Sequence, residues 1–162
     1  MTAWDVTTEA GFMACYRATF ADVYRYAAML CGGDRATAED LVQDVYLAAL
    51  TKARRGAVHE LSTGYLTVAA RHRFLDRVRS SHREERRLRL VSSRPEQEGG
   101  ALAVPGRLAD LPERERAILV LRYVDDLTIA QAADELGISH AAAESLAARA
   151  VRRVRRQEAR DA

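Results

Sequence analysis

All three prolines of this chain fall between residues 95 and 112, and none occurs in the 94 residues before them. Proline interrupts a helix because it lacks an amide hydrogen and its ring clashes with the preceding turn. The first 94 residues are therefore free to form long helices. Apolar side chains recur there at steps of three and four, as at Phe12, Tyr16 and Phe20, and this periodicity is typical of an amphipathic helix.

The N-terminal segment also carries signals for where its first two helices begin and end. The first helix is predicted over residues 8–30, because the pair Gly32 and Gly33 follows it. Asp34 comes directly after that pair, and an aspartate at this point can cap the next helix through its carboxylate. In the second helix, an apolar stripe that includes Leu41 is expected to face the core.

The pattern breaks at residues 54–64, which are predicted to form a loop. Ser62 or Thr63 can cap a third helix, which is expected to continue through the charged residues that follow. Residues 92–106 collect Ser, Pro and Gly without any periodicity and are predicted to form a flexible linker.

After Pro112 the helical pattern returns, with Thr128 placed to cap a short helix, Gly137 to make a turn and Ser139 to cap the last helix. The predicted fold class is all-α, with two helical modules joined by a flexible linker. The N-terminal module is a three-helix bundle and the C-terminal module is a helix-turn-helix bundle; their expected bounds are 1–91, 92–107 for the linker and 108–162.

Composition narrows the class of protein and its compartment. Aromatic residues are only 6% of the chain while 48% is hydrophobic, so the apolar content rests on Ala, Leu and Val, which favours helices. There is no signal peptide and no apolar run near 18 residues, so we expect a cytoplasmic protein without membrane insertion. Cys15 and Cys31 match no metal-ligand spacing and are expected to be buried, inert thiols in a reduced compartment.

The net charge of +2 conceals strong segregation along the chain. It is −2 over residues 1–60, +6 over 61–95, −6 over 96–147 and +4 over 148–162. Two basic blocks separated by acidic ones suggest two places where a polyanion docks. Nearly all the positive charge is arginine, whose planar fork of donors suits phosphates and guanine edges. A GC-rich genome would also favour arginine, and composition alone does not separate the two explanations.

The stretch from Thr128 to Arg153 has the pattern of a helix-turn-helix. Ala133 permits two helices to cross closely, and Gly137 supplies the turn between them. The second helix would present its first turns to the major groove and its later arginines to phosphates. The candidate contact residues are Ser139, His140, Ala141, Glu144, Ser145, Arg149, Arg152 and Arg153. The alternative is a helical hairpin whose arginines are merely solvated.

The third helix carries a second candidate surface. Its basic residues share the helix with Phe74 and Val78, which are expected to face the core, so a nucleic-acid strand could lie along the opposite side. The candidates are Arg71, His72, Asp76, Arg77 and Arg79, with the single carboxylate expected to orient a neighbouring arginine. The alternative is a solvated helix face laced with ion pairs.

Together these segments resemble the extracytoplasmic-function (ECF) sigma factors of bacterial RNA polymerase. AEDLVQDVYLAAL at 38–50 resembles the helix that docks on a coiled-coil of the polymerase clamp, and the resemblance implies a polar docking face of Asp40, Gln43 and Asp44 with Leu41 packed inward. YLTVAARHRFLDRVR at 65–79 resembles the helix that melts and reads the −10 element. Residues 108–139 resemble the module that reads the −35 element, continued by the recognition helix described above.

The resemblance implies core RNA polymerase (clamp coiled-coil and flap) and promoter DNA as partners, an anti-sigma factor in many members, and no cofactor, metal or catalytic site. Three departures stand out. His72 occupies a position where the family often has Asn, and Glu144 and Leu146 occupy positions where many members have basic residues.

Two other functions remain open from the residues alone. A free-standing helix-turn-helix regulator would bind operators as a dimer, but it would not need the acidic second helix or the arginine-rich third. An enzyme or helical adaptor acting on an anionic ligand is a weaker alternative, since the sequence has no Walker A loop, nucleophile elbow or HExxH motif.

Overall fold

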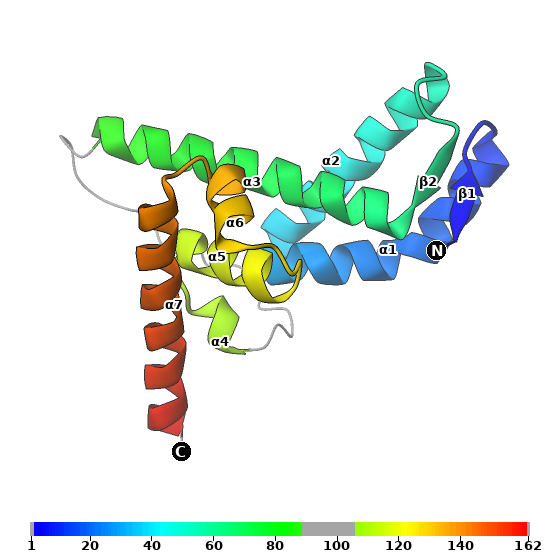
Figure 1. Cartoon of the computed structure of the whole chain (residues 1–162). Coiled ribbons are helices and arrows are strands. Elements are labelled where there is room, and N and C mark those ends of the chain that lie inside the picture. Colours follow the sequence, from blue (N-terminus) through cyan, green and yellow to red (C-terminus); the bar gives the residue numbers. More distant parts are fainter. Residues whose placement is uncertain (1, 89–105, 162) are drawn as a thin grey trace.

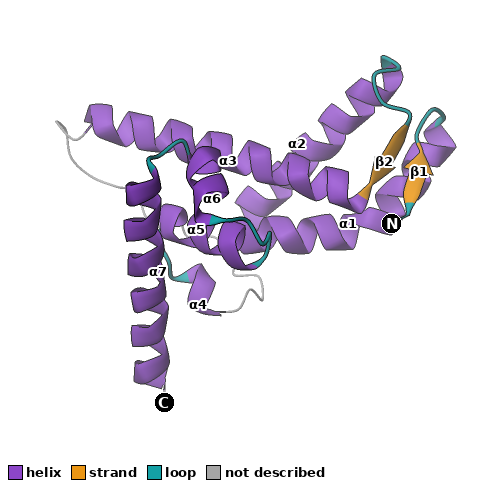
Figure 2. Cartoon of the chain, viewed as in Figure 1, coloured by secondary structure: helices purple, strands orange, loops and turns teal. Residues whose placement is uncertain are grey.

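The computed structural model describes residues 2–88 and 106–161, so most of the predicted linker lies outside the described residues. The described chain is dominated by helices, as Figures 1 and 2 show. The elements are β1 (Ala3–Asp5), α1 (Glu9–Leu30), α2 (Arg35–Arg54), β2 (Glu60–Ser62), α3 (Thr63–Leu88), α4 (Gly106–Ala109), α5 (Glu113–Tyr123), α6 (Ile129–Leu136) and α7 (His140–Asp161).

The predicted helix ends of the N-terminal module are confirmed. The Asp34 carboxylate accepts a hydrogen bond from the Thr37 amide (3.1 Å) at the start of α2, and Gly32 and Gly33 follow α1 with positive φ angles. Ser62 caps α3 by accepting from the Tyr65 amide (3.2 Å). The three helices then pack around a shared apolar core, whose largest fully buried side chains include Val23, Leu41, Val45, Leu66, Phe74 and Val78.

A short two-stranded sheet was not predicted. β1 pairs antiparallel with β2, and Trp4 lies opposite Leu61. β2 falls within residues 54–64, for which the sequence predicts only a loop. Strands of three residues are too short to show an alternating pattern, and their pairing partner lies more than 50 residues away. The buried Leu61 fixes this segment against α1, and so positions the start of α3.

The C-terminal module has the predicted helix-turn-helix. Thr128 and Gln131 form a reciprocal capping box at the start of α6, and Gly137 ends that helix in the left-handed conformation (φ 64°). Ser139 caps α7 by accepting from the Ala142 amide (3.2 Å). Small buried side chains at the crossing, including Ala133, let the two helices approach.

The two modules pack against each other and their buried residues form one continuous cluster. In Figure 1, α5 and α6 lie under the middle of α3 and beside the end of α1, while most of α7 projects away from the rest. The sequence predicts two tethered modules, and periodicity within each helix gives no information on whether the modules touch.

Candidate nucleic-acid and protein interfaces

The exposed side of α2 is a mixed acidic and apolar face. Asp40, Gln43 and Asp44 are all exposed, whereas Leu41 is fully buried and therefore positions the helix rather than lining its surface. Leu47 is 55% exposed and follows the polar residues at helical spacing, so it lies on the same face. The sequence analysis missed Leu47, although its position three residues after Asp44 is the signal. We call these four exposed residues the docking face.

The candidate −10 residues of α3 divide between two directions. His72, Asp76 and Arg77 are exposed to solvent, together with the large side chains of Tyr65 and Val68. Tyr65 was not predicted. Its hydroxyl accepts a hydrogen bond from Lys52 Nζ (3.0 Å), which places a lysine of α2 at the beginning of this surface.

Arg71 and Arg79 instead turn toward the C-terminal module. The Arg71 side chain is only 14% exposed, with Nη1 3.5 Å from Asp125 Oδ2 and Nη2 3.8 Å from Glu135 Oε1. Arg79 forms an ion pair with Asp76, as expected for a carboxylate that orients an arginine, and its Nη1 also donates to the backbone carbonyl of Glu135 (2.9 Å). A cation placed there satisfies a free carbonyl at the last turn of α6.

A tyrosine of α1 completes this contact. The Tyr26 hydroxyl donates to Asp125 Oδ2 (2.8 Å), while His72 Nε2 lies 3.7 Å from Glu135 Oε1. Burial, reinforced by the charge of Asp125, raises the pKa of the Tyr26 phenol well above its usual value. Tyr26, Asp125 and Glu135 were not predicted from the sequence, because no local pattern marks a contact between residues of different modules.

The reading side of the helix-turn-helix is open. Ser139, His140, Ala141, Glu144 and Ser145 are all exposed at the start of α7. His140 Nδ1 lies 3.8 Å from Glu144 Oε2, one helical turn away, so the acidic side chain has a neighbour that is able to carry positive charge.

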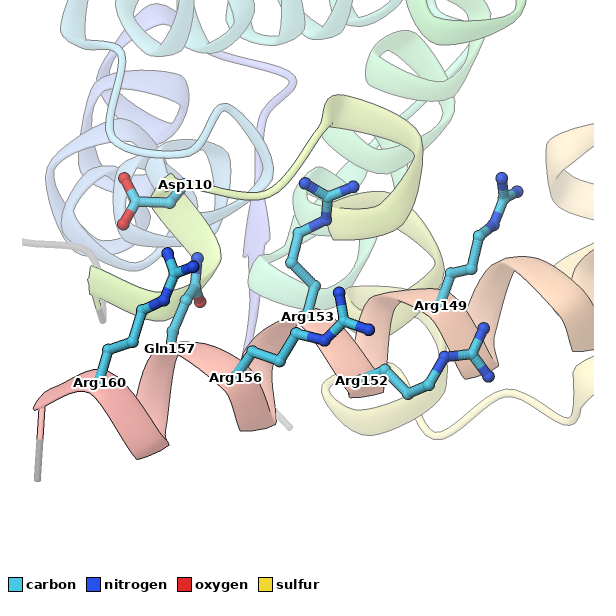
Figure 3. A pocket seen from close by; sticks show the side chains of 7 residues that line it. All are labelled: Asp110, Arg149, Arg152, Arg153, Arg156, Gln157 and Arg160. Atoms are coloured by element: carbon cyan, nitrogen blue, oxygen red, sulfur yellow. The ribbon is translucent and has the colours of Figure 1, made fainter.

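The arginines further along α7 line a groove of about 410 Å³. Arg149, Arg152 and Arg156 have no ion-pair partner among the described residues, whereas Arg153 donates from Nε to the buried carboxylate of Glu115 (2.8 Å). Figure 3 shows five arginines projecting from one stretch of α7, with Asp110 across from them. We call this the arginine groove; it is lined by Asp110, Arg149, Arg152, Arg153, Arg156, Gln157 and Arg160.

A second groove, between α5 and α7, is almost entirely apolar. It has a volume of about 430 Å³. Its lining includes Tyr123, the last residue of α5, whose side chain is 71% exposed, and the next residue, Val124, which is 47% exposed. Val151 and Val154 of α7 form the opposite wall. Exposed apolar surface of this kind marks sites of protein interaction.

Membrane-spanning helices and clusters of metal-ligating side chains are both absent from the described part of the chain, and its two cysteines are buried. None of its helices has the length and hydropathy needed to cross a bilayer, and no three His, Cys, Asp or Glu side chains gather there to hold a metal ion. Both cysteines are buried, and burial raises the pKa of the Cys31 thiol to about 12 and raises that of Cys15 as well. Thiols that stay protonated are poor nucleophiles.

Comparison with known proteins identifies both modules. Residues 15–84 match the family model of Sigma-70 region 2, and residues 107–156 match that of Sigma-70, region 4. No curated protein matches the chain. Among solved structures, it is similar to the sigma factor RpoE from Bartonella quintana in complex with the anti-sigma factor NepR, with 22% identity over 90% of this chain and 94% of that one and a TM-score of 0.51. A chain of the RsbN–BldN complex shows 24% identity over 92% and 93% of the two chains, with a TM-score of 0.36.

A free-standing helix-turn-helix regulator is not favoured, because the region 2 match covers α2 and most of α1 and α3, which such a regulator would not need. The two matches together span about three quarters of the chain, and they occur in the order and with the short separation that the resemblance to ECF sigma factors implied. The chain belongs to the sigma-70 family of RNA polymerase sigma factors.

Proposed function

We propose that this sigma factor binds core RNA polymerase through the docking face of α2 and directs the enzyme to promoters. The observation that carries the proposal is the opposite character of two neighbouring helices in one module. The docking face of α2 exposes Asp40 and Asp44, which repel phosphates, whereas α3 exposes Arg77 and has more arginines than carboxylates along its length, which favours a polyanion. One helix therefore suits a protein partner, the clamp coiled-coil, and the other suits DNA.

The −10 element is read and opened by the exposed side of α3. Bases that leave the stack during melting need a new surface, and the ring of Tyr65 with the adjacent Val68 offers one. Extruding a base costs a few kcal/mol, which stacking and phosphate contacts offset. His72, one turn after Val68 on the same face, supplies a polar contact to that strand, and Arg77, further along α3, supplies a phosphate contact.

The −35 element is contacted by the start of α7. The exposed residues His140, Ala141, Glu144 and Ser145 occupy the turns that enter a major groove in this motif. Glu144 can accept a hydrogen bond from a cytosine amino group. The nearer arginines of the arginine groove, Arg149 and Arg152, bind the adjacent phosphates.

Two further partners belong to the proposal. The apolar groove between α5 and α7 suits the polymerase flap, because an apolar helix would cover Tyr123 and Val124. An anti-sigma factor is the second, since the similar RpoE chain is bound by the anti-sigma factor NepR.

The docking face is tested by a charge reversal with a matched control. Asp44→Arg places a cation in the centre of the docking face and should weaken core polymerase binding at least tenfold, a change of about 1.4 kcal/mol or more. Asp22→Arg makes the same change on an exposed position of α1 and should bind normally. Both variants should keep the helical circular dichroism of the parent. Normal holoenzyme assembly by Asp44→Arg would show that the docking face is misplaced.

A further inference from the structure

We propose that the distal half of the arginine groove binds a guanosine polyphosphate, with Asp110 and Gln157 holding the base and the arginines holding the phosphates. The distal half is the part of the groove that is formed by Asp110, Arg153, Arg156, Gln157 and Arg160. The inference goes beyond promoter recognition, and only its first step rests on the proposed position of α7 at the −35 element.

The distal half lies too far along α7 to serve the −35 element. With the start of α7 in the major groove, His140 lies near the base edges, and that groove is about 12 Å wide. Arg149 and Arg152 lie about 14 and 18 Å further along the helix axis, where long side chains still reach the adjacent phosphates. Arg156 and Arg160 lie about 24 and 30 Å along the axis and are out of reach. Their charge therefore needs another explanation.

The positive charge of the groove is barely offset by the protein itself. Its arginines recur at steps of three and four residues, so they are neighbours on one face of α7 and repel one another. Within the described parts of the chain, Arg153 is the one groove arginine with an ion-pair partner, Glu115. Partial burial and the nearby charge of Arg149 lower the pKa of Arg114, so a further cation lies close to the groove. The helix dipole favours a cation in the last turn, which accounts for Arg160 but not for the arginines before it.

Arg153 is held in place as a phosphate ligand. Its Nε donates to Glu115 Oε2 at 2.8 Å, and this carboxylate is only 8% exposed, whereas the Arg153 side chain is 51% exposed. Its Nη groups have no hydrogen-bond partner among the described residues, and the side chain lines the groove. A guanidinium that is already fixed through one nitrogen loses little freedom when its other nitrogens bind a phosphate.

Two acceptors lie at the distal end of the groove, among the arginines. Asp110 directly follows α4, is exposed and faces Gln157 and Arg160 across the groove (Figure 3). Gln157 Oε1 is buried, and no described residue donates a hydrogen bond to it. A buried acceptor without a donor costs folding free energy, and an N–H group of a ligand would satisfy it. A chain of ionised phosphates has no such donor, so these two residues favour a ligand that also carries N–H groups.

Guanine fits the acceptors better than the other common bases do. Its Watson–Crick edge carries two adjacent donors, the N1–H and the N2 amino group, which match the two oxygens of the Asp110 carboxylate. Adenine and cytosine place a ring nitrogen that accepts beside a single amino group, and this nitrogen would be repelled by Asp110. The planar guanidinium of Arg160 is suited to stacking on the base. The groove volume of about 410 Å³ is in the range of small-ligand sites.

The test measures nucleotide binding to the full chain, without polymerase or DNA. Isothermal titration with GTP, ATP and inorganic tripolyphosphate, in buffer without Mg²⁺, separates the contribution of the base from that of the phosphates. We expect saturable binding of GTP that is at least about tenfold tighter than that of ATP or tripolyphosphate, because the acceptors stay unsatisfied with either of the latter. GTP should also raise the melting temperature more than ATP does, since it binds the folded state more tightly.

Two variants with matched controls separate the two ends of the site. Arg156→Gln should weaken the binding of GTP and of tripolyphosphate several-fold alike, whereas Arg17→Gln removes the same charge from an exposed position of α1 and should bind both normally. Asp110→Asn should lower the affinity for GTP to that for ATP without weakening tripolyphosphate binding, whereas Asp22→Asn should keep the preference for GTP. All four substitutions are at exposed positions, and the variants should keep the helical circular dichroism of the parent.

Three results would overturn the site: binding of GTP that does not saturate, equal affinities for GTP, ATP and tripolyphosphate, or a preference for GTP that survives Asp110→Asn. None of these measurements involves polymerase or a promoter, so they decide the nucleotide site whether or not the protein supports transcription. A failure to bind core polymerase would remove the proposed function and leave the nucleotide titrations unaffected.

Discussion

Tyr26 and Asp125 are 99 residues apart in the sequence, yet the Tyr26 hydroxyl donates a hydrogen bond of 2.8 Å to the Asp125 carboxylate. The same carboxylate faces Arg71 of α3, so one acidic side chain links α1, α3 and the turn that precedes α6. The C-terminal module is thereby held against the helix that we assign to the −10 element. This contact determines several measurable properties of the free protein.

Stability should fall at alkaline pH. Burial raises the pKa of Tyr26 above its usual value of 10, and raises that of Tyr46 to about 12. A phenol whose pKa is higher in the folded state stabilises that state fully below pH 10 and loses this contribution as the pH rises further. The free energy of unfolding, measured in urea, should be flat below about pH 9 and then fall by up to about 1.4 kcal/mol per pH unit for each buried phenol. Tyr26→Phe should fall less steeply, and an unchanged slope would contradict the burial of this hydroxyl.

Gly32→Ala should cost more stability than the same change at Gly56. Both glycines have positive φ angles, 64° and 66°, so both substitutions carry the backbone cost of about 1 kcal/mol. A Cβ at Gly56 meets nothing within 4 Å, whereas one at Gly32 collides with the guanidinium of Arg116. Displacing that side chain breaks hydrogen bonds between the modules and should add about 1–3 kcal/mol. Urea denaturation measures the difference. Equal costs at the two positions would show that the Arg116 guanidinium does not restrict the space beside Gly32.

Alanine substitutions at Leu41 and Leu47 should have different effects, the first on the stability of the fold and the second on polymerase binding. Leu41 is fully buried, so Leu41→Ala should lower the free energy of unfolding by about 2–5 kcal/mol. Leu47 is 55% exposed, so Leu47→Ala should change stability by less than about 0.5 kcal/mol. It should nevertheless weaken core polymerase binding several-fold, as measured by a fluorescence titration. Wild-type affinity of Leu47→Ala would remove this residue from the docking face.

The neighbours Arg152 and Arg153 should respond differently to the same substitution. Arg152 is exposed without an ion pair among the described residues, so Arg152→Gln should reduce the slope of log K against log salt for duplex DNA by about 1, whatever the sequence. Arg153 is bonded to the buried Glu115, so Arg153→Gln should instead lower stability by about 1–3 kcal/mol. If Arg153→Gln instead reduced the salt slope and left the stability unchanged, Arg153 would have to leave Glu115 and contact a phosphate when DNA binds.

The sequence predicts the helices and most of their ends because that information is local. Asp34, Thr128 and Gly137 act within four residues of themselves, through capping bonds or a left-handed turn, and all three are placed by the structure as expected. The polar side of α2 and the exposed start of α7 follow from periodicity in the same way.

Local sequence patterns do not predict contacts between segments that are far apart in the chain. The pairing of β1 with β2 joins segments that are each three residues long, and neither shows an alternation on its own. Arg71 has the features of a nucleic-acid contact, and nothing near it in sequence reveals that Asp125 faces it. The candidate surfaces were thus predictable one helix at a time, whereas the contact of Arg71 and Arg79 with the C-terminal module follows only from the assembled helices.

Run-off transcription with core RNA polymerase tests the central claim most directly. Core enzyme would be assayed on templates covering the genome of origin, with and without this protein and with Asp44→Arg as the inactive control. The account predicts new transcripts of defined length that require the protein and are lost with the variant. The absence of any added initiation on all templates would contradict the assignment of this chain as a sigma factor that directs transcription.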